Sequence, residues 1–182
     1  MERSWRGRRP LTAELANKAL NCTFLSINKE SSLFRSALQG RRLSDLGAGN
    51  PHAMMLFADY YGAREYVGVD ASRDYSMLEG ILVNTRFERV DMLRFLGDQE
   101  DCSSNIVMNN IDRAVLSMDD RELERAYSIL MLHQIARVVP PGGIAFGIGT
   151  DLLHGLAHYR FLRMEHTGAY SVSDAGAVYL KP

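Results

Sequence analysis

Short apolar runs alternate with longer stretches of helical periodicity along most of this chain. The apolar runs have the length of buried strands, whereas the stretches between them, such as Pro51 to Tyr61 and Arg121 to Val138, suit helices. This repeated order predicts parallel strands joined by right-handed crossovers. We therefore expect an α/β sheet built from the runs Arg42 to Leu46, Glu65 to Val69, Phe87 to Val90, Asn105 to Asn109 and Ile144 to Ile148.

The C-terminal part of the chain breaks this alternation. Phe161 to Tyr170 and Ala177 to Leu180 both have strand character, and Ser173, Asp174 and Gly176 make a turn-rich link between them. Such a link favours an antiparallel pair. The sequence therefore predicts a Rossmann-like, mostly parallel sheet with helices on both faces and a C-terminal antiparallel hairpin.

Two stretches before the first strand place apolar residues at helical spacing. They run from Leu11 to Asn21 and from about Leu25 to Leu38, with Thr12 or Ser31 available as caps. We expect residues 1–40 to form a helical extension or lid and residues 41–182 to form the Rossmann-like domain. A chain of 182 residues, 46% of them hydrophobic, has enough apolar material for one substantial core.

Composition and charge narrow the environment and the partners. The 21 basic and 22 acidic residues leave a formal charge of -1, so no global field attracts nucleic acid or an anionic membrane. The four arginines within the first nine residues fit a solvated tail better than a phosphate-binding arm. Two isolated cysteines, no signal-peptide h-region and no long apolar run favour a cytoplasmic protein without a membrane segment.

A glycine-containing turn follows the first predicted strand. Asp45 is the penultimate residue of this strand, and Gly47 and Gly49 follow where the chain enters a helix. Glycines at such a turn let the backbone bend tightly and approach a ligand closely. Asp45, two residues before the first of these glycines, suits a ligand with a positively charged amino-acid end.

Two further acids follow the next two predicted strands. Asp70 comes about 20 residues after the glycines, where a carboxylate can accept both hydrogen bonds of a ribose diol. Asp91 follows the third run, where it can accept from an adenine amino group while Met92 or Leu93 packs on the ring. Each acid alone fits an ordinary solvated strand end, but the regular series favours a nucleoside site.

From about Arg42 to the C-terminus, these motifs resemble the class I S-adenosylmethionine-dependent methyltransferase family. Its first motif matches Asp45, Gly47 and Gly49, its ribose-binding acid matches Asp70, and its adenine-side acid matches Asp91. The fourth-strand motif resembles the stretch from Asn105 to Asp112, and Asn109 joins the cofactor-binding set together with Met92. The turn from Arg137 to Gly143 is similar to the family's entry into strand five. The resemblance implies S-adenosylmethionine as cofactor and methyl transfer as activity.

Two positions depart from the family pattern. Asn50, Pro51 and His52 stand where a third glycine is common, and Asn105 stands where many members have an acid. The first departure argues against a nicotinamide dehydrogenase, the nearest enzymatic alternative, because close approach to a pyrophosphate favours a small residue at the position of His52.

The methyl acceptor is less defined than the cofactor. The stretch from Asn109 to Asp112 lacks the Asn/Asp-Pro-Pro-aromatic signature of amino-methylating nucleic-acid enzymes, and no large insertion separates the last strands. We therefore favour a small-molecule acceptor over nucleic acid, and a protein side chain stays open as a further alternative. The N-terminal helices or a partner subunit can supply a lid over the acceptor, or the site has none. A homodimer is therefore one possible assembly.

Asp112 and His154 are the candidate general bases if the acceptor must lose a proton. No acidic or histidine cluster has the spacing of a catalytic metal site. Because no base is obvious, a non-catalytic S-adenosylmethionine-binding or partner-regulating module stays open as the alternative.

Overall fold

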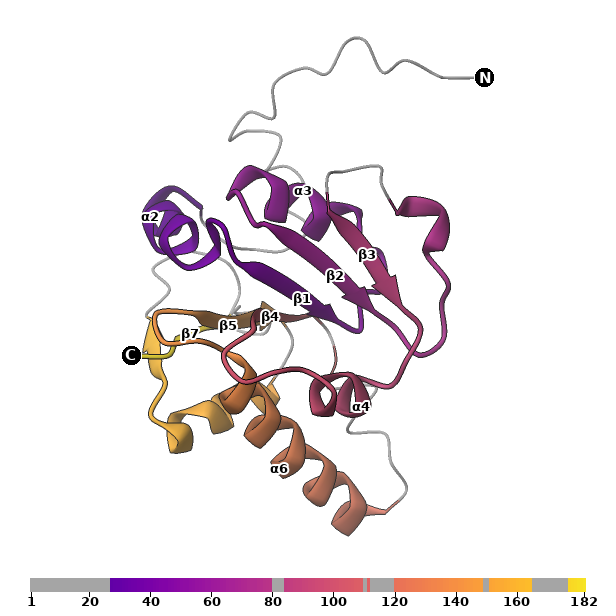
Figure 1. The fold of residues 1–182 in the computed structure, drawn as a ribbon. Coiled ribbons are helices and arrows are strands. Elements are labelled where there is room, and N and C mark those ends of the chain that lie inside the picture. Colours follow the sequence, from indigo (N-terminus) through magenta and orange to yellow (C-terminus); the bar gives the residue numbers. More distant parts are fainter. Residues whose placement is uncertain (1–26, 80–83, 110, 112–119, 149–150, 165–176) are drawn as a thin grey trace, which may run out of the picture.

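The computed structural model describes residues 27–79, 84–109, 111, 120–148, 151–164 and 177–182 (Figure 1). Their centre is a seven-stranded sheet of order β3-β2-β1-β4-β5-β7-β6. The strands are β1 (Arg42–Leu46), β2 (Glu65–Val69), β3 (Thr85–Glu88), β4 (Ser104–Asn109), β5 (Ile144–Ile148), β6 (Leu162–Met164) and β7 (Ala177–Leu180).

The sheet has the expected mixed topology. Strands β1 to β5 pair in parallel, whereas β7 pairs antiparallel with both β5 and β6. The chain leaves β1 towards β2 and β3 on one side and returns to place β4 on the other side. The order of strands therefore reverses between β1 and β4, the place where open α/β sheets form a ligand crevice.

Helices cover both faces of the sheet (Figure 1). Helices α2 (Ile27–Leu38) and α3 (His52–Tyr60) supply one apolar cluster, in which Phe34 and Phe57 pack with Phe146 of β5 at centroid distances of 5.2 and 5.5 Å. This part of the predicted extension 1–40 is thus built into the core. The boundary at residue 40 and a lid role stay predictions, and Leu11 to Asn21 lies outside the described residues.

The opposite face packs against α4 (Met92–Gly97), α6 (Arg121–Val138) and the 3-10 helix η2 (Asp151–Tyr159). On β4, Ile106 and Met108 belong to this face while Val107 belongs to the other, and all three are fully buried. A central strand buried on both sides explains why the sequence shows a continuous apolar run there instead of alternation.

The structure differs in detail from some of the predicted elements. The third strand is Thr85–Glu88, two residues earlier than predicted, because its pairing with β2 places Phe87 beside Gly68. A Cβ on Gly68 would lie 2.6 Å from the Phe87 ring, so the glycine makes room for it. Of the run Phe161 to Tyr170, Leu162–Met164 forms β6, and residues 165–170 lie outside the described part. Short helices α4, η1 (Ser76–Leu78) and η2 were not predicted.

Asn105 explains one departure from the family pattern. Its side chain is fully buried and donates to the backbone oxygens of Ala37 (3.0 Å) and Arg42 (3.2 Å). Its Oδ1 accepts from the backbone N–H of Ile144 at 2.8 Å. An amide can donate and accept at once, which a carboxylate cannot do. Asn105 therefore ties α2, β1 and β5 together at the amino edge of the sheet.

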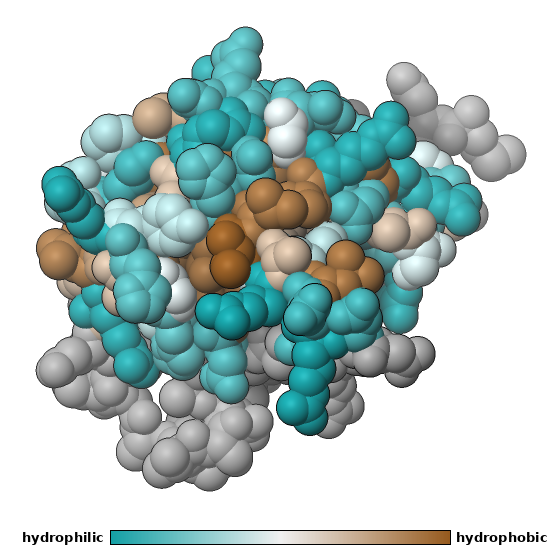
Figure 2. All heavy atoms as spheres, turned by 90° about the horizontal axis from the view of Figure 1, so that it is seen from below, coloured by the Kyte–Doolittle hydropathy of each residue, from teal (hydrophilic) through white to brown (hydrophobic). Residues whose placement is uncertain are grey.

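The outer side of α6 keeps an apolar character. Leu123, Ile129 and Leu130 are 58%, 51% and 49% exposed. Figure 2 views the molecule from below and shows hydrophobic side chains gathered near the middle of this face, within a hydrophilic surround. Despite this apolar surface, none of the helices in the described ranges combines the length and hydropathy needed to cross a bilayer.

Candidate functional site

A crevice of about 920 Å³ opens outside the carboxyl ends of β1, β2 and β4. It lies at the point where the strand order reverses, as expected for a ligand site in a sheet of this type. Every residue predicted to contact a cofactor lines it: Asp45, Gly47, Gly49, Asp70, Asp91, Met92 and Asn109. Residues from four separate stretches of the sequence are thus brought to one place.

The turn after β1 is shaped for close approach of a ligand. Gly47 and Gly49 have φ values of 70° and 48°, a region in which residues with a Cβ are strained. The backbone N–H groups of Gly47 and Ala48 both donate to the carbonyl of Val69, at 2.8 and 2.9 Å, which fixes the turn against the end of β2. A Cβ on Gly47 would lie 2.6 Å from Cδ1 of Ile111, so this glycine also leaves room for the Ile111 side chain that lines the crevice.

Asp70 holds two loops of the crevice together. Its Oδ1 accepts from the backbone N–H and the hydroxyl of Ser72, at 2.9 and 2.8 Å, and from the N–H of Arg73 at 3.1 Å. Its Oδ2 accepts from the N–H of Gly49 at 3.2 Å. Partial burial opposes ionisation, but the hydrogen bonds from Ser72, Gly49 and Arg73 outweigh it and lower the pKa of Asp70. Asp70 is therefore an anion at neutral pH.

Asp45 is buried at the bottom of the crevice, with 2% of its surface exposed. Its Oδ2 accepts from the hydroxyl of Tyr66 at 2.6 Å. The pKa of Asp45 is raised to about 7, mainly by burial and in part by the charge of Asp70, against the lowering effect of the Tyr66 hydrogen bond. Burial and the neighbouring Asp45 raise the pKa of Tyr66 well above its ordinary value. Among the described residues this buried carboxylate has no cationic partner, which suits a site that receives a cationic ligand group.

Asp91 has a structural task that the sequence analysis missed. It was predicted as an acid at the end of a strand, but it lies three residues beyond β3 and is the N-cap of α4. Its Oδ1 accepts from the N–H groups of Leu93 and Arg94, at 2.9 and 3.1 Å, and its Oδ2 accepts from the hydroxyl of Tyr127 at 3.1 Å. Burial and the nearby carboxylate raise the pKa of Tyr127 to about 12, so its hydroxyl stays a donor.

The structure separates one predicted general base from the crevice. His154 lies on η2, where its Nδ1 is 2.5 Å from the hydroxyl of Tyr179 and its Nε2 is 3.5 Å from Asp151. Tyr179 pairs with Ala145 near the beginning of β5, far from the carboxyl edge, and His154 is not among the described residues that line the crevice. The other candidate, Asp112, lies outside the described residues.

Other crevice residues escaped the sequence analysis. Ile111, Met54 and Ala71 add apolar surface, and His52 and Arg73 add basic groups at the rim. Arg73 donates to the carbonyl of Gly49 at 2.8 Å and so reinforces the glycine turn. Ile111 had a usable signal, since it directly follows the end of the fourth strand. Within the described parts of the chain, no group of three or more acidic, histidine or cysteine side chains is arranged to hold a metal.

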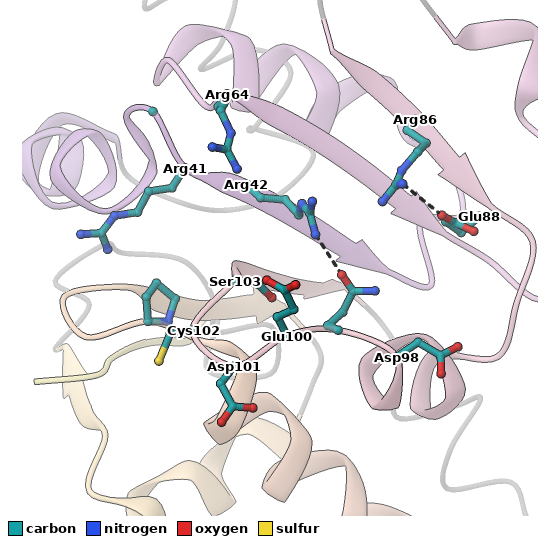
Figure 3. Close-up of a pocket in the computed structure, with 13 residues that line it drawn as sticks. Arg41, Arg42, Arg64, Arg86, Glu88, Asp98, Glu100, Asp101, Cys102 and Ser103 are labelled. Atoms are coloured by element: carbon teal, nitrogen blue, oxygen red, sulfur yellow. Dashed lines mark hydrogen bonds and ion pairs between the residues drawn. The ribbon is translucent and has the colours of Figure 1, made fainter.

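A second hollow, of about 720 Å³, lies at the opposite, amino edge of the sheet. Figure 3 shows arginines from the beginnings of the strands on one side and the acidic stretch before β4 on the other. Arg42 contacts Glu65 at 2.6 Å and Gln99 at 2.9 Å, and Arg86 lies 3.6 Å from Glu88. Because its basic and acidic groups balance, this hollow has no strong preference for an anion such as phosphate.

Known proteins share the fold of this chain. No protein-family model and no curated protein sequence matches it. Precorrin-6y C5,15-methyltransferase from Geobacter metallireducens aligns over 96% of this chain and 91% of its own, with a TM-score of 0.56 and 10% identity. Ribosomal protein L11 methylase from Lactobacillus delbrueckii subsp. bulgaricus aligns over 86% and 80%, with a TM-score of 0.52 and 16% identity. The 16S rRNA methyltransferase RsmC of T. thermophilus, in complex with AdoMet and guanosine, aligns over 98% of this chain and 45% of its own, with a TM-score of 0.53 and 17% identity.

These likenesses, at 10 to 17% identity, concern the fold. The chain has the Rossmann-like fold of class I S-adenosylmethionine-dependent methyltransferases, with the reversed last strand included. The predicted fold class is confirmed.

Proposed function

We propose that this protein binds S-adenosylmethionine in the crevice at the carboxyl edge of the sheet and transfers its methyl group. The observation that carries the proposal is the convergence of Asp45, the Gly47–Gly49 turn, Asp70 and Met92 on one cavity at the point where the strand order reverses. When bound, the cofactor supplies a methyl group on a positively charged sulfonium, which is already activated for displacement.

The crevice residues fit the parts of such a cofactor. Asp70, held as an anion by four hydrogen bonds, is placed for the ribose hydroxyls, and Met92 and Ile111 offer apolar surface to an adenine ring. Asp45 is placed for a cationic amino-acid end. A pyrophosphate would instead meet three carboxylates in this crevice, which disfavours a nicotinamide dinucleotide.

Positioning is the main contribution that these residues make to catalysis. The rigid glycine turn and Asp70 orient the cofactor, and alignment of the reacting atoms lowers the entropic part of the barrier. Asn109 ends β4 at the crevice, on the side from which an acceptor would approach. With His154 on another part of the fold, Asp112 is the general base that we propose for an acceptor that must lose a proton.

The acceptor class is a separate part of the proposal. By their names, proteins of this fold act on ribosomal protein L11, on 16S rRNA and on a precorrin. The fold therefore accommodates acceptors of very different size. Our proposal of a small molecule rests on the lack of an inserted recognition segment and on the balanced net charge of -1. The homodimer and the cytoplasmic location stay predictions from the sequence.

Calorimetry with S-adenosylmethionine, S-adenosylhomocysteine and NAD tests the cofactor assignment. We expect the first two to bind and NAD to give no heat. Binding of NAD without a response to S-adenosylmethionine would refute the proposal. Labelled S-adenosylmethionine, offered with a metabolite extract, total RNA or a protein extract in parallel, then identifies the acceptor class.

A non-catalytic module that binds S-adenosylmethionine is the second candidate. The position of His154 outside the crevice favours it over an enzyme that needs this base. One measurement distinguishes the two functions. The wild-type protein, which retains Asp112, binds the cofactor in both cases, but a non-catalytic module transfers no label to any of the three extracts.

A further inference from the structure

Asp45 is the only carboxylate among the described residues that is buried. No arginine, lysine or histidine forms an ion pair with it in this part of the chain, and its one hydrogen bond from a side chain comes from Tyr66. Burying an acid without a cation costs free energy. The fold alone does not require an acid at position 45, because an asparagine there could accept the hydrogen bond from the Tyr66 hydroxyl equally well.

Among the residues that the structure describes, no side chain around Asp45 supplies a compensating positive charge. Asp70, directly after β2, is an anion that raises the pKa of Asp45, and Tyr75 contributes to the raised pKa of Tyr66. His52 on α3 hydrogen-bonds to Asn50, and Arg73 is engaged with the carbonyl of Gly49. Asp91, across the crevice, contributes a third carboxylate. Within the described part of the chain no side chain supplies the cation that Asp45 lacks, so the ligand is its expected source.

We propose that Tyr66 is a positioning residue that holds Asp45 for the ammonium group of an amino-acid-bearing nucleoside, and that this pair makes the affinity for such a ligand rise with pH. The inference rests on the proposed cofactor. It assigns to Tyr66, which does not line the crevice, a role in recognising the amino-acid end of the ligand.

The direction of the pH effect follows from the proton on Asp45. Below about pH 7 the free protein carries this proton, because burial favours the neutral acid. An ammonium group binds the ionised form, so binding must release the proton. Affinity then falls towards tenfold per pH unit as the pH drops below that value. Without the Tyr66 hydrogen bond, which lowers the pKa of Asp45, the decline begins at a higher pH.

Two ligands separate this effect from binding of the nucleoside. S-adenosylhomocysteine carries the ammonium group, whereas 5′-methylthioadenosine has the same nucleoside without the amino-acid end. Calorimetry between about pH 5.5 and pH 8 should show a steep loss of affinity on acidification for the first ligand and a nearly flat profile for the second. The full chain is used throughout, and circular dichroism checks that each variant is folded.

Three variants complete the test. Tyr66→Phe should move the onset of the decline to higher pH for S-adenosylhomocysteine alone, and Asp45→Asn should abolish the decline. His52→Gln is the matched control, since it removes the histidine that lines the same crevice and leaves Asp45 and Tyr66 in place. The pH dependence of the affinity for S-adenosylhomocysteine should persist in the His52→Gln variant.

Each outcome decides between the two claims. Equal pH profiles for both ligands, a slope that disappears with His52→Gln, or an unchanged onset in folded Tyr66→Phe would overturn the role of the Asp45–Tyr66 pair while leaving the cofactor assignment intact. If neither nucleoside binds at any pH, the proposed function itself fails.

Discussion

Asn105→Asp should destabilise the protein strongly, although many members of the methyltransferase family that the fourth-strand motif resembles carry an acid at this position. In the structure the amide donates to two buried carbonyls, those of Ala37 and Arg42, and accepts from the N–H of Ile144. An ionised aspartate would direct an oxygen at both carbonyls, and a protonated one could donate to only one of them.

The magnitude follows from the two donor bonds. Leaving a buried acceptor unsatisfied costs about 1–3 kcal/mol, so losing both bonds costs about 2–6 kcal/mol at neutral pH. The folded variant should take up a proton to reduce this cost, which raises the pKa of the introduced carboxyl group above its value in the unfolded chain. The destabilisation is then present above the folded pKa and shrinks as the pH falls towards the unfolded pKa, because the proton restores one donor.

Urea denaturation at about pH 5 and pH 7.5 measures this difference in the free energy of unfolding. Asn105→Ala is the matched control, since it removes the same bonds without introducing a titratable group. The loss in free energy of unfolding of the Asn105→Ala variant should not depend on pH. A loss below about 1 kcal/mol for the aspartate variant at neutral pH, or the same pH dependence in both variants, would refute the reasoning.

Four further predictions concern the crevice. Asp70→Ala should weaken S-adenosylmethionine binding by about 1.5–3 kcal/mol in calorimetry, because a hydrogen-bonded charged partner is lost; unchanged affinity in a folded variant would remove Asp70 from the site. Gly47→Ala should lower the free energy of unfolding by about 1 kcal/mol, owing to its φ of 70°, and should reduce cofactor affinity by crowding the turn; an effect on neither quantity would contradict the close-approach role. Asp91→Ala should cost about 1 kcal/mol of stability through loss of the α4 cap, and Asp91→Ser should recover part of it in the same denaturation assay. Asp45→Asn should make the protein more stable than wild type by a margin that grows as the pH rises from about 4 to about 7, since the folded pKa of Asp45 lies above the unfolded one; a margin that shrinks over this range would show that Asp45 is not a buried acid of raised pKa.

The fold class followed from the sequence because each strand is bounded by turns and bears a local apolar pattern. The bounds of β1, β2 and β5 match the prediction residue for residue. Burial on both faces leaves few alternatives for such runs. The crevice residues could also be predicted from the sequence, since the carboxyl ends of parallel strands meet at one edge of the sheet regardless of how the side chains pack.

Side-chain partners, by contrast, depended on the tertiary structure. Nothing near Asp45 in the sequence identifies Tyr66 as its donor, and nothing near Asp91 identifies Tyr127, because each pair is joined across elements. His154 follows β5 as a crevice residue would, but η2 turns back to pack on α6, and the histidine meets Tyr179 instead. Local periodicity determines which segments are strands and helices. Only long-range packing determines which polar groups become buried together, and that burial sets their charge.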